Sequence, residues 1–273
     1  MALLPFFAFV GTFLLVPAIA LFVRAARPVD GGSRPALMDA MSRDFRGSFL
    51  FSTRISAVSA VIGALVGLLL ALAVSRIERP RWLRDSVVGF SGVAANLGGI
   101  PLAFAFIAAL GAQGLVTRIL YHWGLDLYGN GFRISDDWGI VVVYLYFQIP
   151  LMLLVMLPAV EGLRHEWAES NAVMGGSTLH YWRRIGLPVL APSILGGTLL
   201  LFANAFSAYA TAYALSSGAS DLVPVQIRFF LQGDTITGKG NLGYALAAWM
   251  IIVLAVSLVC YLTMRRRAER WRA

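Results

Sequence analysis

The stretch ISAVSAVIGALVGLLLALAVS, Ile55–Ser75, decides what kind of protein this chain can be. It contains no charged residue, and its 21 positions match the length of about 20 residues that an α-helix needs to cross the hydrocarbon layer of a membrane. Its residues do not alternate between apolar and polar, as they would in a strand of a transmembrane barrel. Because a backbone in lipid must satisfy its hydrogen bonds internally, the stretch predicts a membrane-spanning helix.

The rest of the chain has the same character. Of its 273 residues, 59% are hydrophobic and 13% are charged, and the mean hydropathy is +0.75, whereas a soluble domain carries about 25% charged residues. Five further charge-free runs flank the first one. We therefore expect an all-α integral membrane protein, a single domain over residues 1–273, with six transmembrane helices. These spans are expected at residues 3–24, 51–76, 86–112, 138–160, 187–214 and 241–265.

The basic residues indicate an orientation. Six spans put both termini on one side of the membrane, and that side, which includes the tail RRRAERWRA, carries 12 of the 22 Lys and Arg residues. Basic residues accumulate on the cytoplasmic side, so we expect a multi-pass protein of the bacterial inner membrane with both termini in the cytoplasm. Anionic lipid then accounts for the net charge of +8, and no nucleic acid partner is expected.

The sequence also limits the chemistry of the chain. Its single cysteine, Cys260, forms no internal disulfide, and its three histidines lack the spacing of metal ligands, so no metal site is expected. No phosphate-binding loop of the Walker type is present. No histidine or acidic residue lies at the middle of a predicted span, which argues against a proton-coupled carrier and against a membrane-embedded enzyme.

The most polar interior segment long enough to form structure of its own is WAESNAVMGGSTLHYWRRIGLP, Trp167–Pro188, between the fourth and fifth predicted spans. Residues 163–174 can form a helix, and Gly175 can end it in the left-handed conformation. Ser177 or Thr178 can then cap a second short helix over LHYWRRI, and Pro188 suits the first turn of the next span. The pattern predicts a stiff elbow between two spans. An ordinary amphipathic loop on the lipid surface is the alternative.

This segment resembles the EAA loop of binding-protein-dependent ABC importer permeases of the MetI-like, type I family. The family pattern is Glu-Ala-Ala, three residues, Gly, nine residues, and then Ile-x-Leu-Pro. The chain has Glu169, Gly175 and Ile185–Pro188 at that spacing. It departs from the pattern at the two alanines, where Ser170 and Asn171 stand.

The resemblance implies a function and a set of partners. It implies that residues 161–186 form a cytoplasmic coupling loop against one of two separate ATPase subunits, which bind ATP and Mg, so that this chain carries no cofactor and is no enzyme. It further implies a second permease subunit, expected to be a different chain rather than a copy, and an extracytoplasmic solute-binding protein. The overall look is similar to the branch that imports polyamines, iron or aminophosphonates. The residues expected to couple to the ATPase are Glu169, Gly175, Gly176, Ser177, Trp182, Arg183, Leu187 and Pro188.

A permease also needs a path for its solute. Polar residues inside spans are costly and usually face the interior of the helix bundle. Pro101 and Pro150 are expected to interrupt helices there and to free carbonyl groups. Hydrogen bonding between helices is the alternative role for each polar residue. A channel or a structural membrane protein without an ATPase remains the alternative function. The candidate path residues are Asn96, Gln148, Asn204, Ser207, Tyr209, Thr211 and Tyr213.

Overall fold

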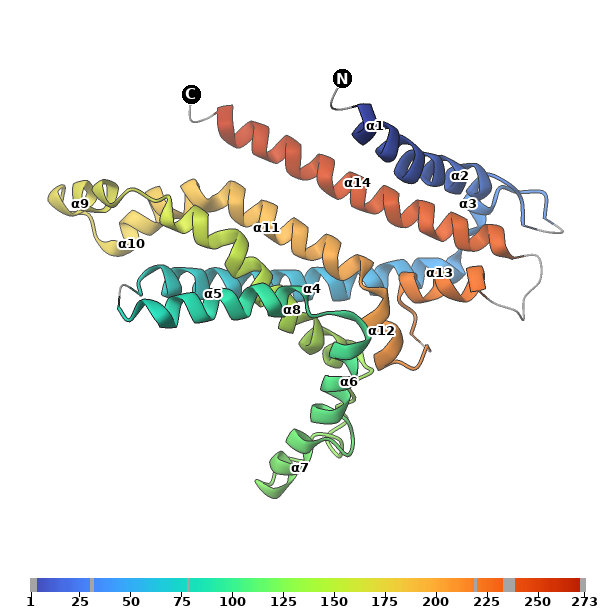
Figure 1. The fold of residues 1–273 in the computed structure, drawn as a ribbon, viewed down its shortest axis with the longest axis horizontal. Coiled ribbons are helices and arrows are strands. Elements are labelled where there is room, and N and C mark those ends of the chain that lie inside the picture. Colours follow the sequence, from blue (N-terminus) through green and yellow to red (C-terminus); the bar gives the residue numbers. More distant parts are fainter. Residues whose placement is uncertain (1–3, 30–31, 78, 219, 233–238, 271–273) are drawn as a thin grey trace. The chain divides into compact units, whose positions relative to one another are not determined.

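The computed structural model describes residues 4–29, 32–77, 79–218, 220–232 and 239–270. Figure 1 shows helices along the whole described chain, and within these ranges the only β pairing is a single bridge between Pro28 and Pro35. The all-α fold class predicted from the sequence is confirmed.

Among the described residues, five helical stretches are long and apolar enough to cross a membrane. A shorter apolar helix, Gly11–Ala25, stands where the first span was predicted, and α1 (Leu4–Val10), η1 (Gly11–Leu15) and α2 (Val16–Ala25) follow one another without a break. The structure thus has five candidate spans and a shorter apolar helix in place of the six predicted spans. The five stretches are Phe45–Ser75, Gly99–His122, Asp137–Glu161, Thr178–Ser207 and Gly240–Thr263.

The chain forms two compact units. The first unit comprises Met1–Thr53 and Gly218–Val256, and the second comprises Arg54–Ser217 and Ser257–Ala273. The first unit contains α1, η1, α2, α3 (Ala36–Asp39), α13 (Val223–Gln232), the start of α4 (Arg43–Ser75) and most of α14 (Gly240–Arg270). Each unit is described by itself below.

Small side chains form the core of the first unit. Ala25, Ala36 and Ala40 pack with Ala245 and Ala248, which allows the backbones to approach closely. Side chains then fasten the loop after α2 to α14: the Trp249 indole N–H donates to the carbonyl of Leu37 at 2.9 Å, and the Asn241 amide donates to the carbonyl of Pro28 at 2.7 Å. The polar loop is therefore packed against a helix.

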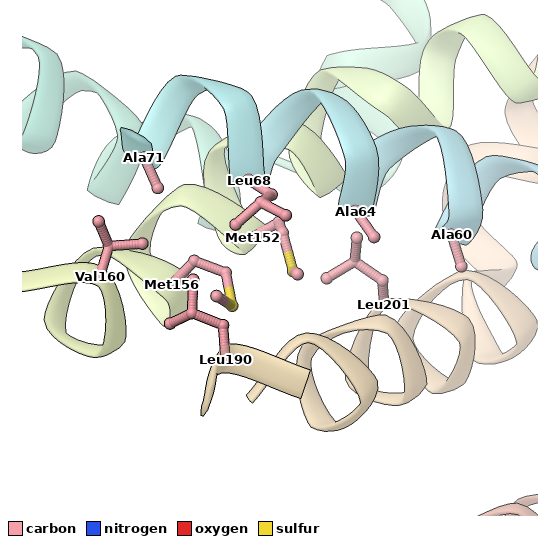
Figure 2. Packing of buried hydrophobic residues seen from close by; sticks show 9 residues of the cluster. All are labelled: Ala60, Ala64, Leu68, Ala71, Met152, Met156, Val160, Leu190 and Leu201. Atoms are coloured by element: carbon pink, nitrogen blue, oxygen red, sulfur yellow. The ribbon is translucent and has the colours of Figure 1, made fainter. Parts of the chain in front are cut away.

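The core of the second unit lies between α4, α8 (Asp137–Glu161) and α11 (Leu187–Ser207). Figure 2 shows the α4 side chains of this cluster pointing toward side chains from α8 and α11. A Cβ atom added to Gly67 of α4 would lie 2.5 Å from the Cβ of Met152, so α4 and α8 are in direct contact there. The cluster consists of Ala60, Ala64, Leu68, Ala71, Met152, Met156, Val160, Leu190 and Leu201.

Ion pairs hold α8 at both ends. At its start, Asp137 pairs with Arg54 of α4. At its end, Glu161 pairs with Arg84 of α5 (Arg81–Asn96). The start of α5 therefore lies at the same end of the unit as the end of α8, and the α9–α10 loop (His165–Val173 and Thr178–Tyr181) follows directly from there.

The predicted third span, 86–112, differs most from the structure, because it is broken into two helices. Helix α5 ends at Asn96, Leu97 leaves the helical region with ψ 85°, and α6 (Gly99–Leu110) begins at a glycine with φ +75°. The apolar stretch then continues through α7 (Leu115–His122). Pro101 lies in the first turn of α6, where its missing N–H is no loss, so it helps to start a helix and does not interrupt one.

The predicted fifth span, 187–214, is also broken, at Ala208 with ψ 89°, between α11 and α12 (Tyr209–Leu215). No glycine or proline stands at this break. Pro150, which was expected to interrupt a helix, lies inside the continuous helix α8. The prolines therefore did not predict where the helices break, and the break at Ala208 needs another explanation.

A widened turn joins α10 to α11. In η2 (Trp182–Gly186) the N–H of Leu187 donates to the carbonyl of Trp182, five residues back, and the next residue, Pro188, has no N–H. The segment η1 does the same before Pro17, since the N–H of Val16 donates to the carbonyl of Gly11. The short helix expected over 179–185 is consequently not separate: residues 178–207 form one continuous helical stretch.

Candidate functional site

The turn between α9 and α10 has the geometry expected from its two glycines. Gly175 has φ +76°, and its N–H donates to the carbonyl of Ala172 at 3.0 Å. The N–H of Gly176 donates to the carbonyl of Asn171 at 2.8 Å. This pair of bonds is the Schellman arrangement that ends a helix. The Oγ of Ser177 then accepts the N–H of His180 at 3.2 Å, so the predicted serine cap of the second helix is confirmed.

Asn171, which the sequence marked only as a departure from the family pattern, is a part of this turn. Its side chain is buried, and its Nδ2 donates to the carbonyls of Gly176 at 3.0 Å and Ser177 at 3.2 Å. The departure from the family pattern at this position thus contributes hydrogen bonds to the turn. A polar residue four positions before a Gly-Gly pair was the signal available in the sequence.

The tip of the elbow presents three apolar side chains in exposed positions. Val173 is 88% exposed, Met174 79% and Leu179 77%. Glu169 is also exposed, and its Oε1 lies 3.7 Å from the Nε2 of His165, one turn back. Exposed apolar side chains with charged neighbours are typical of a surface that binds another protein.

The elbow is fastened to the core of the second unit. Trp182 and Leu163, at its two ends, pack against the cluster drawn in Figure 2. The Tyr181 ring meets the Trp182 ring edge-on at 5.6 Å, and a Cβ atom at Gly186 would lie 2.6 Å from the Trp182 ring. The elbow is therefore packed against the helices of the second unit at both of its ends. The remaining predicted coupling residues, Arg183, Leu187 and Pro188, follow at the start of the long helical stretch.

A cavity of about 570 Å³ lies where the two helix breaks of the second unit meet. The residues that line it come from the end of α5, the start of α6, the end of α11 and the start of α12, with Phe147 and Leu151 from α8. The structure brings five of the seven predicted path residues together here. These five are Asn96, Asn204, Ser207, Tyr209 and Thr211.

Hydrogen bonds join the two breaks across this cavity. The backbone N–H of Gly99 donates to the Thr211 Oγ1 at 2.9 Å, and this hydroxyl donates back to the carbonyl of Gly99 at 3.3 Å. The Tyr144 hydroxyl donates to the carbonyl of Ala208 at 3.0 Å, which satisfies a group freed by the break. A break in a membrane helix is tolerated where such partners exist.

Gln148 and Tyr213, the other two predicted path residues, do not line this cavity. Gln148 is fully buried, and its Nε2 donates to the Ser59 Oγ of α4 at 3.2 Å. This bond corresponds to the interhelical alternative for a polar residue in a span. The ring of Tyr213 contacts the ring of Tyr209, with 5.5 Å between their centroids.

Comparison with known families gives one match over most of the chain. The family described as "Binding-protein-dependent transport system inner membrane component" matches residues 63–272. Among curated proteins, the molybdenum transport system permease protein ModB of Mycobacterium tuberculosis is 26% identical, with 89% of this chain and 86% of that protein covered. A probable permease protein for starch degradation products, AmyD of Thermoanaerobacterium thermosulfurigenes, is 23% identical, with 83% and 77% covered.

Solved structures show the same fold. A bacterial alginate ABC transporter, crystallised in complex with an alginate pentasaccharide-bound periplasmic protein, superposes with a TM-score of 0.73 at 21% identity, with 97% of this chain and 93% of that chain covered. The MetNI methionine ABC transporter in an inward-facing conformation gives a TM-score of 0.55 at 14% identity, with 84% and 99% covered.

Proposed function

The chain belongs to the binding-protein-dependent transport system inner membrane components, and from this membership we propose that it lines the solute path of an ATP-driven importer and couples to the ATPase through its α9–α10 loop. It is a multi-pass inner-membrane permease component, and the ATPase of such importers is a separate subunit. ATP and Mg would accordingly bind to that subunit, and this chain needs no cofactor of its own.

The observation that carries the coupling proposal is the elbow at α9–α10. Its apolar tip is exposed, while its base is packed into the core through Trp182. A loop that only rested on lipid would not need a fixed turn with a left-handed glycine at 175, a serine cap and two further side-chain bonds. A contact that transmits force needs both a surface for the partner and a rigid attachment to the spans.

The continuity of residues 178–207 suggests how the movement reaches the solute. The coupling tip begins this helical stretch, and Asn204 and Ser207 of the cavity lie at its other end. Thirty residues of helix cover about 45 Å, which is more than the hydrocarbon thickness of a membrane. A tilt imposed on the tip by the ATPase would therefore move one wall of the cavity directly. The break at Ala208 would allow α12 to follow separately.

The partners follow from the same proposal. They are two ATPase subunits, a second permease subunit, membrane lipid and an extracytoplasmic solute-binding protein. We further propose that the second permease subunit is a different chain and that both termini lie in the cytoplasm. The relatives are named for molybdenum, sulfate and starch degradation products, so membership of the family does not fix the substrate. Transport of polyamines, iron or aminophosphonates stays a prediction.

Reconstitution with the ATPase tests the proposal. Together with the second permease subunit, the wild-type chain should co-purify with the ATPase and stimulate Mg-ATP hydrolysis in nanodiscs. A variant in which residues 177–184 are replaced by a Gly-Ser linker should insert into the membrane and lose both properties. If the variant still binds and stimulates the ATPase, the coupling role of this loop is wrong. Solute flux without ATP would instead support the alternative of a channel.

A further inference from the structure

The two glycines of the α9–α10 turn are there for different physical reasons. Gly175 has φ +76°, and a Cβ atom added to it would meet nothing within 4 Å, so the backbone alone requires a glycine. Gly176 has no such φ. A Cβ atom there would lie 2.2 Å from the Oδ1, 2.7 Å from the Cγ and 2.8 Å from the Nδ2 of Asn171. The space beside Gly176 is therefore occupied by one particular side chain.

That side chain connects the end of α9 to the start of α10. Asn171 is 5% exposed, and both of its Nδ2 bonds go to carbonyls beyond the Schellman turn, those of Gly176 and Ser177. The carbonyl of Ser177 also accepts the N–H of Tyr181 and so belongs to the first turn of α10. One amide group with two N–H donors thus ties the last turn of one helix to the first turn of the next.

We propose that Asn171 is a positioning residue of the coupling contact and that Asn171 and Gly176 are a matched pair. The amide fixes the direction in which α10 leaves α9, and Gly176 leaves the room that the amide needs. An alanine at 171, as in the EAA pattern, could make neither bond and would not need a glycine at 176. The inference rests on the proposed coupling function, because direction matters only if α10 meets a partner.

Four variants and one control separate this role from general stability. Asn171→Asp keeps the shape but replaces the donor with an oxygen that faces two carbonyls. Asn171→Ala removes the side chain, Gly176→Ala inserts the clashing atom, and the double variant carries both alanines. Ser170→Ala is the matched control, because Ser170 is the exposed neighbour at which the chain also departs from the family pattern.

The direction of α10 is measured without any partner. With Cys260 changed to alanine, spin labels are placed at Glu166 of α9 and His180 of α10, and their separation is measured by pulsed electron paramagnetic resonance. The wild type and Ser170→Ala should give one narrow distance distribution. Asn171→Asp, Asn171→Ala and Gly176→Ala should each broaden or shift it. An unchanged distribution in both Asn171 variants would overturn the inference.

Coupling is measured as Mg-ATP hydrolysis in nanodiscs that contain the chain, the second permease subunit and the ATPase, with and without the solute-binding protein as purified. Each single variant should lower the stimulated rate about fivefold or more, the effect of losing hydrogen bonds worth about 1 kcal/mol each. Adding Gly176→Ala to Asn171→Ala should cause no further loss, because the clash is gone. If the losses of Asn171→Ala and Gly176→Ala multiply in the double variant, the matched pair is refuted. The same holds if the single variants at 171 and 176 hydrolyse ATP as fast as Ser170→Ala. If the wild type itself fails to bind the ATPase, the proposed function fails, while the label distances still decide the geometry.

Discussion

The variants Gly175→Asn, Gly175→Ala and Gly175→Val form a series that differs in how easily each residue adopts the backbone conformation of this position. A Cβ atom added at this position meets nothing within 4 Å, so we expect the penalty to come from φ +76°. Asparagine adopts the left-handed conformation readily. This conformation costs alanine about 1–2 kcal/mol and a β-branched residue up to about 3 kcal/mol.

The penalty for valine is as large as the interactions that hold the turn. The two backbone bonds of the Schellman arrangement contribute about 1 kcal/mol each. We therefore expect the valine variant to give up the left-handed turn and to misdirect α10. The core cluster of the second unit contains no residue of the turn, so the chain should stay folded and inserted.

The assay is the stimulated Mg-ATP hydrolysis of the chain with the second permease subunit and the ATPase in nanodiscs, together with thermal unfolding of the chain alone in detergent. The asparagine variant should be close to wild type, the alanine variant lower, and the valine variant lower by about tenfold or more, since 1.4 kcal/mol corresponds to a factor of ten and the valine penalty is up to about 3 kcal/mol. The unfolding midpoint should be the same in all four proteins. If the valine and asparagine variants hydrolyse ATP equally fast, the turn does not position the coupling helix.

Three further predictions concern other parts of the chain. Gly67→Ala should lower the free energy of unfolding by about 1–3 kcal/mol in a detergent melt, because its Cβ would lie 2.5 Å from a side chain of α8, whereas Gly89→Ala meets nothing within 4 Å and should not. Thr211→Val should lower the free energy of unfolding by about 1–3 kcal/mol and reduce solute-stimulated hydrolysis, because it leaves the N–H of Gly99 without its partner. The control is Thr198→Val, which removes a hydrogen bond within one helix. Equal losses in both variants would count against a special role for the break. Glu169→Lys should change thermal stability by less than about 1 kcal/mol, since its pair is exposed, yet lower ATPase stimulation; normal stimulation would show that this charge takes no part in coupling.

Local chemistry made part of the site predictable from the sequence. The left-handed Gly175 and the Ser177 cap depend on residues within a few positions of each other, and the sequence predicted both. The position of the elbow could be predicted from the sequence for the same reason, because it depends on neighbouring residues. The sequence did not predict that α10 continues into α11. A proline usually marks a helix boundary, but here a widened turn keeps the helix continuous at Pro188.

The solute cavity was only partly predictable. Polarity inside apolar runs correctly selected five residues that line it, but it also selected Gln148, which bonds to Ser59 of another helix. Polarity shows that a side chain needs a partner in the membrane, and it does not show whether that partner is a solute or a helix. Glu169 is a similar case, because a sequence shows its charge but not that the nearest basic group is His165.

The sequence by itself determined that the chain is a bundle of membrane helices, because charge-free runs such as Ile55–Ser75 can satisfy their backbone in lipid only as helices. Only the tertiary structure decided where those helices break. Nothing near Ala208 in the sequence marks a break, and its free carbonyl is stabilised by the hydroxyl of Tyr144, 64 positions away. The other break is held by Thr211, 112 positions from Gly99. A local pattern cannot reveal such partners, because folding alone brings them within hydrogen-bonding distance.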